Sequence, residues 1–188
     1  MSLYAIEGVL ILDAAGERIY AKYYHPPHAE GEGEGEGQTG PFATHKQQLE
    51  FESELFAKTH KKDAEIMLCE GHLVLYKEYV DLSLILVGAQ GENELVLQAA
   101  FDAYRGALEL VLSGGLDKKA VEENYDLVLL TVDELVDNGI ILETDPAAIA
   151  SRVTKAPDET VALDLDKGLL GAWGFAKSKF QERLQQGL

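Results

Sequence analysis

The stretch AEIMLCEGHLVLYKEYVDLSLILV, residues 64–87, decides the fold. It contains three runs rich in aliphatic and aromatic residues, the composition of β-strands: residues 64–69, 73–79 and 82–87. Only Glu70-Gly71-His72 separates the first two runs, and only Val80-Asp81 separates the last two. Because a parallel pair needs a crossover of a dozen or more residues, these short separators predict hairpin turns and antiparallel strands.

A second hairpin precedes this stretch. Residues 3–12 are aliphatic at both alternating sets of positions, as in a strand that is buried on both faces. The turn Asp13-Ala14-Ala15-Gly16 follows, and RIYAKYY, residues 18–24, forms the returning strand. Between the two hairpins, ATHKQQLEFESELFAKTH, residues 43–60, is typical of a helix with a thin apolar stripe. Most of that stripe comes from Leu49, Leu55 and Phe56.

Helices dominate the sequence after the last strand. Apolar residues recur at three-to-four spacing from Asn93 or Gly91 to the pair Gly114-Gly115, which predicts one long helix. A second helix is predicted over residues 118–138, and a small helix over 146–153 begins with a proline. We expect the second helix to bury these apolar positions: Val121, Tyr125, Val128, Leu129, Val132, and Leu135 or Val136.

The order of these elements is β-β-α-β-β-β-α-α plus a small helix. A short antiparallel sheet flanked by helices is an α+β architecture, and here it forms a domain over residues 1–153. Residues 154–166 are polar and are typical of a linker. The tail that follows, 167–188, is amphipathic and basic, with Trp173 and Phe180 on its apolar stripe. We expect these two residues to pack either on the acidic domain or on a partner or membrane interface.

The composition excludes several classes of protein. Thirty-three acidic residues stand against 16 basic ones, and the net charge of −17 disfavours nucleic acid and anionic lipid as direct partners. The single cysteine, Cys69, excludes an internal disulfide framework and is typical of a reducing compartment. No apolar run reaches the ~18 residues of a membrane span, and the N-terminus does not resemble a secretory signal. These features predict a soluble, intracellular protein.

The motif GEGQTG, residues 35–40, matches the pattern G-x-G-x-x-G of dinucleotide sites. Such a site needs a parallel strand that turns directly into a helix, whereas the strand before this motif belongs to a hairpin. The preceding glutamates, among them Glu34 and Glu36, would also repel a pyrophosphate. We therefore predict a flexible acidic insertion over about residues 26–41 and no cofactor. A nucleotide-binding enzyme that uses this motif is the alternative.

No combination of residues indicates catalysis or a metal site. His25 and His28 flank two prolines in a loop, and no cysteine accompanies them, so they do not form a zinc site. Cys69 is predicted to be a buried residue without a cationic neighbour, which disfavours a nucleophile. Asp133 and Asp137 share one helical face and indicate a solvated acidic surface. We predict that the protein is not an enzyme.

Four segments together resemble one protein family: VLILDAAGERIYAKYY (9–24), FAKTHKKDAEIMLCEGHLVLYKEYVDL (56–82), ENELVL (92–97) and TVDELVDNGIILETDP (131–146). The chain closely resembles the zeta-subunit family of the coatomer (COPI) coat over about residues 3–153. It is more distantly similar to the small (sigma) chains of clathrin adaptors. The resemblance implies a longin-type domain, in which a five-stranded antiparallel sheet carries one helix on one face and two on the other.

The resemblance also implies a function. Zeta subunits are non-catalytic, and each pairs directly with the coat's gamma subunit, whose helical trunk cradles the longin domain. An Arf-family GTPase recruits the whole coat to Golgi membranes, from which it carries cargo to the endoplasmic reticulum. The implied protein is therefore cytoplasmic, it meets the other coatomer subunits and the GTPase through the complex, and its association with membranes is indirect.

The alternative is a clathrin-adaptor small chain that binds dileucine sorting signals. In the sigma chains a shallow apolar pocket receives these signals. The positions here that correspond to that pocket, and that are candidate contacts, are Val80, Leu82, Leu95, Arg105 and Gly114. Arg105 stands where the pocket would need an apolar side chain, which disfavours this alternative.

Overall fold

The computed structural model of the chain describes residues 2–25, 41–62, 65–112 and 114–154. The chain divides into two units, Met1–Thr154 and Lys155–Leu188. The second unit, with Trp173 and Phe180, lies outside the described residues, as do the GEGQTG motif and nearly all of the predicted acidic insertion.

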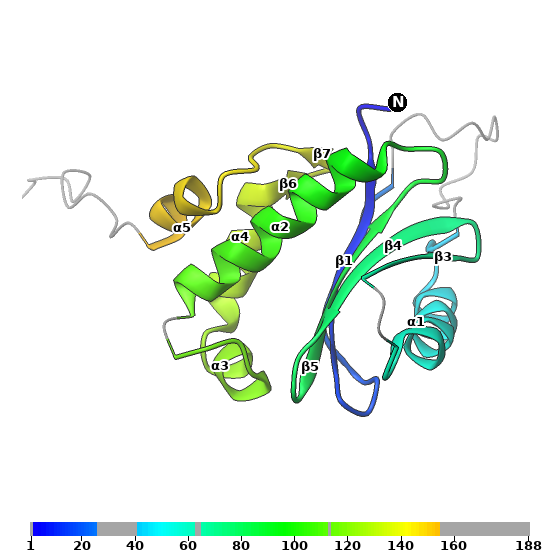
Figure 1. Cartoon of the computed structure of the whole chain (residues 1–188), viewed down its shortest axis with the longest axis horizontal. Coiled ribbons are helices and arrows are strands. Elements are labelled where there is room, and N and C mark those ends of the chain that lie inside the picture. The colour runs from blue at the N-terminus through cyan, green and yellow to red at the C-terminus, as the bar shows by residue number, and fades with distance from the viewer. Residues whose placement is uncertain (1, 26–40, 63–64, 113, 155–188) are drawn as a thin grey trace, which may run out of the picture. The chain divides into compact units, whose positions relative to one another are not determined.

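A five-stranded sheet organises the first unit (Figure 1). Its strands are β1 (Ile6–Asp13), β2 (Arg18–Tyr23), β3 (Ile66–Cys69), β4 (His72–Glu78) and β5 (Leu82–Gly88). Their order across the sheet is β2-β1-β5-β4-β3, and every neighbouring pair is antiparallel. The antiparallel arrangement predicted from the short separators is confirmed. The central strands, β1 and β5, are almost entirely buried, because helices cover both of their faces.

The turn between β3 and β4 is tighter than the sequence suggested. His72 is the first residue of β4 and pairs with Cys69, so only two residues form the turn. Glu70 and Gly71 have φ values of 49° and 86°, which is the left-handed geometry that a two-residue hairpin of type I′ requires. The turn between β4 and β5 is longer, and the Tyr79 N–H donates to the Leu82 carbonyl at 2.8 Å.

Helices cover the two faces of the sheet unequally (Figure 1). Helix α1 (His45–Thr59) lies alone on one face. Helix α2 (Glu94–Val111) crosses the other face, with α4 (Tyr125–Leu135) and α5 (Pro146–Thr154) packed against it. The short helix α3 (Lys118–Glu123) connects α2 to α4. The expected α+β architecture is confirmed, with separate apolar clusters on the two faces.

Helix α1 buries a different set of residues from the one we predicted. A capping box starts it: the Gln47 N–H donates to Thr44 Oγ1, and the Thr44 N–H donates to Gln47 Oε1 at 2.9 Å. Leu55 is buried as expected, but Leu49 is 44% exposed and Phe51 points into the core instead. The buried face of this helix therefore includes polar side chains, among them Glu52, beside its few apolar ones.

The helix predicted over residues 118–138 is wrong in its length. Asn124 adopts φ −123° and ψ 37°, which separates α3 from α4. The buried residues Val121, Val128, Val132 and Leu135 keep one helical stripe across this break, as predicted. Tyr125 and Leu129 lie at its margin and are 41% and 37% exposed, although we expected them to be buried. Helix α4 then ends at Leu135.

A small hairpin follows α4, which the sequence reading missed. Strands β6 (Val136–Asp137) and β7 (Ile140–Ile141) pair around Asn138 and Gly139, whose φ values of 47° and 84° again fit a type I′ turn. The Ile6 N–H donates to the Gly139 carbonyl at 3.0 Å, and a Cβ at Gly139 would lie only 2.6 Å from the Ile6 carbonyl oxygen. This glycine therefore fixes the hairpin against the start of β1.

Candidate functional site

The candidate site lies where the turn between β4 and β5 meets the C-terminal part of α2 and the start of α3. Three contacts hold this turn in place: Tyr79 bonds to Leu82, the Ala14 N–H donates to the Asp81 carbonyl at 3.0 Å, and the Lys118 N–H donates to Asp81 Oδ2 at 3.1 Å. Val80 stands at the tip of the turn and is fully exposed. A rigid turn therefore presents one apolar side chain to solvent.

The other candidate residues do not gather around Val80. Leu82 is 1% exposed and packs in the core beneath α2, so it anchors the turn and is not available to a ligand. Leu95 lies in the first turn of α2 and is 78% exposed. It is separated from Arg105 by about 15 Å along the helix. Gly114 follows the end of α2, with open space where a side chain would stand.

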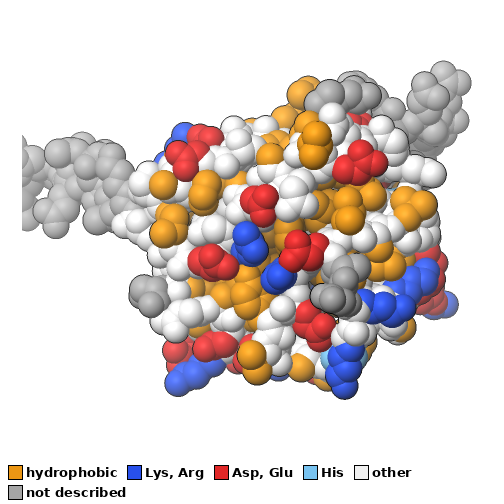
Figure 2. Space-filling view, viewed as in Figure 1, with side chains coloured by type: hydrophobic (Ala, Val, Ile, Leu, Met, Phe, Trp, Pro, Cys, Tyr) orange, Lys and Arg blue, Asp and Glu red, His pale blue; other side chains and the backbone are white. Residues whose placement is uncertain are grey.

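Arg105 lies in a group of charged side chains between α2 and β4. Its guanidinium is 3.5 Å from Asp102 Oδ1, and its Nε is buried without a hydrogen-bond partner among the residues described. On the strand beside it, Lys77 Nζ contacts Glu65 Oε1 at 2.6 Å, and this hydrogen bond lowers the pKa of Glu65. Figure 2 shows blue and red side chains together at the centre of this face.

Tyr79 completes this charged group. Its hydroxyl donates to Glu109 Oε1 on α2 at 3.1 Å. Burial, together with this carboxylate, raises the pKa of Tyr79, so the phenol keeps its proton and remains a donor. The bond ties β4 to α2 next to the turn.

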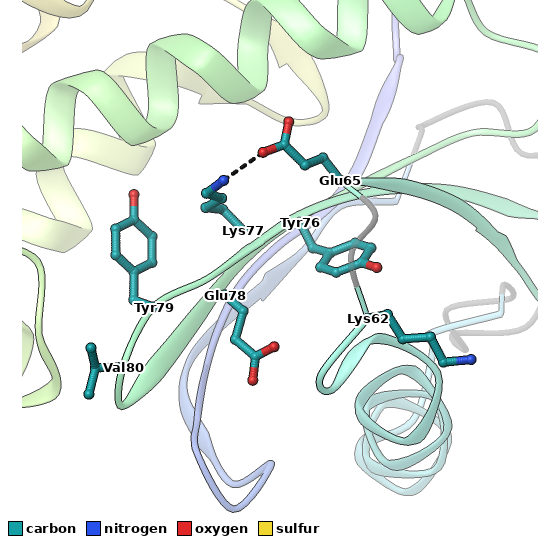
Figure 3. Close-up of a pocket in the computed structure, with 7 residues that line it drawn as sticks. All are labelled: Lys62, Glu65, Tyr76, Lys77, Glu78, Tyr79 and Val80. Carbon is teal, nitrogen blue, oxygen red and sulfur yellow. Dashed lines mark hydrogen bonds and ion pairs between the residues drawn. The ribbon is translucent and has the colours of Figure 1, made fainter.

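A broad open hollow of about 660 Å³ lies along the outer side of β4, beside Val80. The residues that line it are Lys62, Glu65, Tyr76, Lys77, Glu78, Tyr79 and Val80 (Figure 3). In Figure 3, Lys77 and Tyr79 point toward α2, whereas Tyr76 and Glu78 point toward α1. The hollow thus wraps around the strand, and four of its seven lining residues, Lys62, Glu65, Lys77 and Glu78, are charged. It does not have the apolar walls that a pair of leucine side chains would need.

Two histidines elsewhere in the domain have acidic partners. Two histidines without an obvious partner in the sequence are paired: His60 Nδ1 is 2.9 Å from Glu78 Oε1, and His72 Nδ1 is 2.5 Å from Glu7 Oε2. These contacts join residues far apart in the chain, so no local signal could have revealed them. Across the described parts of the chain, no group of three His, Cys, Asp or Glu residues could hold a metal ion.

Cys69 is buried, as predicted, but it does have a cationic neighbour. Lys58 Nζ lies 3.8 Å from Cys69 Sγ. Burial nevertheless raises the pKa of the thiol above its ordinary value. The charge of Lys58 is in addition paired with Glu54. The protonated thiol is a poor nucleophile. Among the helices that are described, none is long and apolar enough to cross a membrane.

Comparison with known proteins gives a consistent result. The sequence pattern of the family described as clathrin adaptor complex small chain matches residues 5–160. The chain is 61% identical to coatomer subunit zeta of Saccharomyces cerevisiae over 190 residues, which cover 100% of this chain and 98% of the relative. It is 39% identical to coatomer subunit zeta-1 of Homo sapiens over 152 residues, 81% of this chain and 78% of the relative.

The fold is also found in a larger assembly. The structure matches a chain from a homology model of the full-length AP-3 complex in a stretched open conformation, with a TM-score of 0.58. The match covers 93% of this chain and 98% of that chain at 15% sequence identity. At such low identity the likeness concerns the fold alone.

Proposed function

The chain belongs to the coatomer zeta subunit family, within the clathrin adaptor complex small chain family, and we propose on this premise that it pairs with the gamma subunit of the COPI coat. Members of this family are coat subunits and not enzymes, which confirms the prediction of a non-catalytic protein. The identity of 61% along nearly the whole length of a zeta subunit is the observation that carries the proposal.

The proposed role is assembly of the coat for transport from the Golgi to the endoplasmic reticulum. The chain would act in the cytoplasm and reach Golgi membranes and COPI vesicles through the complex. Gamma is the direct partner, whereas the other coatomer subunits and an Arf-family GTPase are met through the assembly. The net charge of −17 supports indirect membrane association, because the chain would be repelled by anionic lipids.

We assign Val80 and Leu95 as candidate contacts with gamma, because both side chains are apolar and largely exposed. Arg105, whose guanidinium lies beside Asp102 on α2, is a third candidate. Leu82 would act through the turn that it anchors. Trp173 and Phe180 stay candidate contacts in the C-terminal tail.

The test is coexpression of the full chain with the trunk of gamma, followed by size-exclusion chromatography. We expect a complex with one copy of each protein. Val80→Asp and Leu95→Asp should weaken the complex, whereas Leu49→Asp, at a position that is 44% exposed on α1 on the opposite face of the sheet, should not. Failure of the unaltered pair to co-elute would refute the proposal.

The adaptor alternative, recognition of dileucine signals, is not favoured. Leu82 is buried, Arg105 is charged, and four of the seven residues that line the hollow beside Val80 are charged.

A further inference from the structure

The outer edge of β3 presents unpaired backbone groups. The Tyr76 N–H donates to the Glu65 carbonyl at 2.9 Å, and Met67 and Cys69 lie opposite Val74 and His72. In an antiparallel ladder, alternate residues bond to the same neighbour. The N–H and C=O groups of Ile66 and Leu68 therefore point away from β4, toward the side where the described part of the chain adds no further strand.

The same two residues expose apolar side chains. Ile66 is 43% exposed and Leu68 is 59% exposed, although their cross-strand partners, Leu75 and Leu73, pack in or against the core on the α2 face. The cause is the position of α2, which covers the centre of the sheet and leaves β3 uncovered (Figure 1). Figure 2 shows orange side chains over this part of the sheet. The opposite face of β3 is closed, because Met67 and Cys69 pack in the cluster beneath α1.

Edge strands usually carry features that prevent pairing with other chains, such as charges, prolines or bulges. The other edge of this sheet, β2, carries Arg18 and Lys22, and its register with β1 is interrupted between Ile11 and Leu12. In contrast, β3 consists of Ile-Met-Leu-Cys, without a charge or a proline. Its edge is therefore open to an additional strand.

We propose that β3 binds an extended segment of another protein as a sixth strand of the sheet. Backbone hydrogen bonds to Ile66 and Leu68 would supply affinity. Apolar side chains at alternate positions of the segment would cover the side chains of the same two residues. Glu70 follows the strand, whereas Glu65 before it is already paired with Lys77, so a segment with lysine or arginine beside Glu70 fits best. This inference goes beyond pairing with gamma and does not depend on it.

Charge also decides between this occupant and a second copy of the chain. Pairing of two β3 strands across a two-fold axis would place one Glu70 at each end of the new strand pair, on chains that each carry a net charge of −17. Like charges opposite one another destabilise a strand pair. The basic, apolar segment avoids this repulsion.

The probe is the blocked peptide Lys-Thr-Val-Thr-Val-Thr-Lys, added to the full chain at up to millimolar concentration. Binding is measured by amide hydrogen exchange of Ile66 and Leu68 and by fluorescence anisotropy of the labelled peptide. The matched control peptide has the same side chains but N-methyl groups on both valines, which removes two backbone donors. We expect the first peptide to slow exchange at both amides and the control peptide not to do so.

A pair of protein variants provides the second control. Leu68→Lys should weaken peptide binding about tenfold or more, because it adds to the edge a positive charge that repels the lysines of the peptide. Leu130→Lys makes the same change at an exposed position on α4 and should have no effect. Equal binding of the N-methylated peptide, equal effects of the two variants, or no protection at Ile66 and Leu68 would each overturn the proposal. So would a dimer of the chain that Leu68→Lys dissociates, because the occupant would then be a second copy.

Discussion

On the α1 face of the sheet a buried carboxylate, Glu52, accepts hydrogen bonds from Arg18 and Tyr23, whereas on the α2 face Tyr20 and Tyr104 bury hydroxyls without a described hydrogen-bond partner. Arg18 meets Glu52 through two nitrogens, at 2.6 and 3.0 Å, and the Tyr23 hydroxyl is 2.8 Å from Oε1. The two faces of one sheet are thus stabilised by different means.

The difference follows from what each helix can supply. Helix α1 buries few apolar residues, so a charged network fixes its position on the sheet. Helix α2 buries eight residues and is backed by α4 and α5, so close packing fixes its position. The stability that a polar network provides is lost when any one of its members is removed. The stability of a large apolar cluster depends instead on how completely its side chains fill the available volume. Four experiments test this comparison, from the largest expected effect to the smallest.

Leu108→Ala should have the largest effect. Leu108 is completely buried on α2, and its removal leaves a cavity that the surrounding helices cannot fill. We expect the free energy of unfolding to fall by about 4 kcal/mol. Chemical denaturation measures the loss, with Leu110→Ala as control, since Leu110 is 56% exposed on the same helix. Equal losses in the two variants would contradict the role of packing on this face.

Glu52→Ala should lower the free energy of unfolding by about 3 kcal/mol, because it leaves Arg18 partly buried without its carboxylate. The matched control is Glu50→Ala, which removes an exposed carboxylate that is 3.7 Å from Lys46. That change should cost less than about 1 kcal/mol. If both variants unfold at the same denaturant concentration, the network does not stabilise α1.

Tyr23→Phe and Tyr104→Phe make the same chemical change on the two faces. The first removes a hydroxyl that donates to Glu52 and should cost about 1 kcal/mol. The second removes a buried hydroxyl without a described partner, and it should leave stability unchanged or raise it by about 1 kcal/mol. Thermal and chemical unfolding of both variants measure these changes in stability. Effects of the same sign and size would show that the faces do not differ.

Asp13 should give the smallest effect, which depends on pH. Burial by itself would raise the pKa of Asp13, but hydrogen bonds from Lys118 Nζ and from the Glu17 and Ala15 N–H groups lower it overall. A lowered pKa in the folded state gives stability that is present above the ordinary carboxyl pKa of about 3.9 and is lost as the pH falls through the folded value.

Asp13→Asn removes this contribution at neutral pH. The difference in free energy of unfolding between the original chain and the variant should therefore shrink as the pH falls below about 4. Equilibrium denaturation at a series of pH values measures it. A difference that stays constant through this range would show that the carboxylate is not the source of the effect.

Much of the fold followed from short-range signals. The two-residue and three-residue separators around β4 allowed only hairpins, and the apolar spacing from Asn93 onward allowed only a long helix. The break at Asn124 was missed because asparagine is tolerated within helices, and its dihedral angles depend on packing around it. The Asn138-Gly139 dipeptide did carry a local signal for a hairpin, but the helical pattern before it concealed that signal.

The candidate site was less accessible to sequence reasoning. Val80 could be placed in a turn, but its full exposure depends on the contacts of Asp81 with Ala14 and Lys118. The neighbours of Arg105 and the pairing of His72 with Glu7 likewise join distant segments. No spacing in a single sequence reports such contacts.

The sequence by itself determined the order of the five main strands and of the helices α1 and α2, the antiparallel sheet and, through the resemblance of its segments, the family. These are properties of local periodicity and turn length, which neighbouring residues encode. Only the tertiary structure decided that Glu52 is buried, that Leu129 is exposed, and that α2 stops short of β3. Burial depends on which distant surface covers a residue, and the two faces of this sheet differ for that reason.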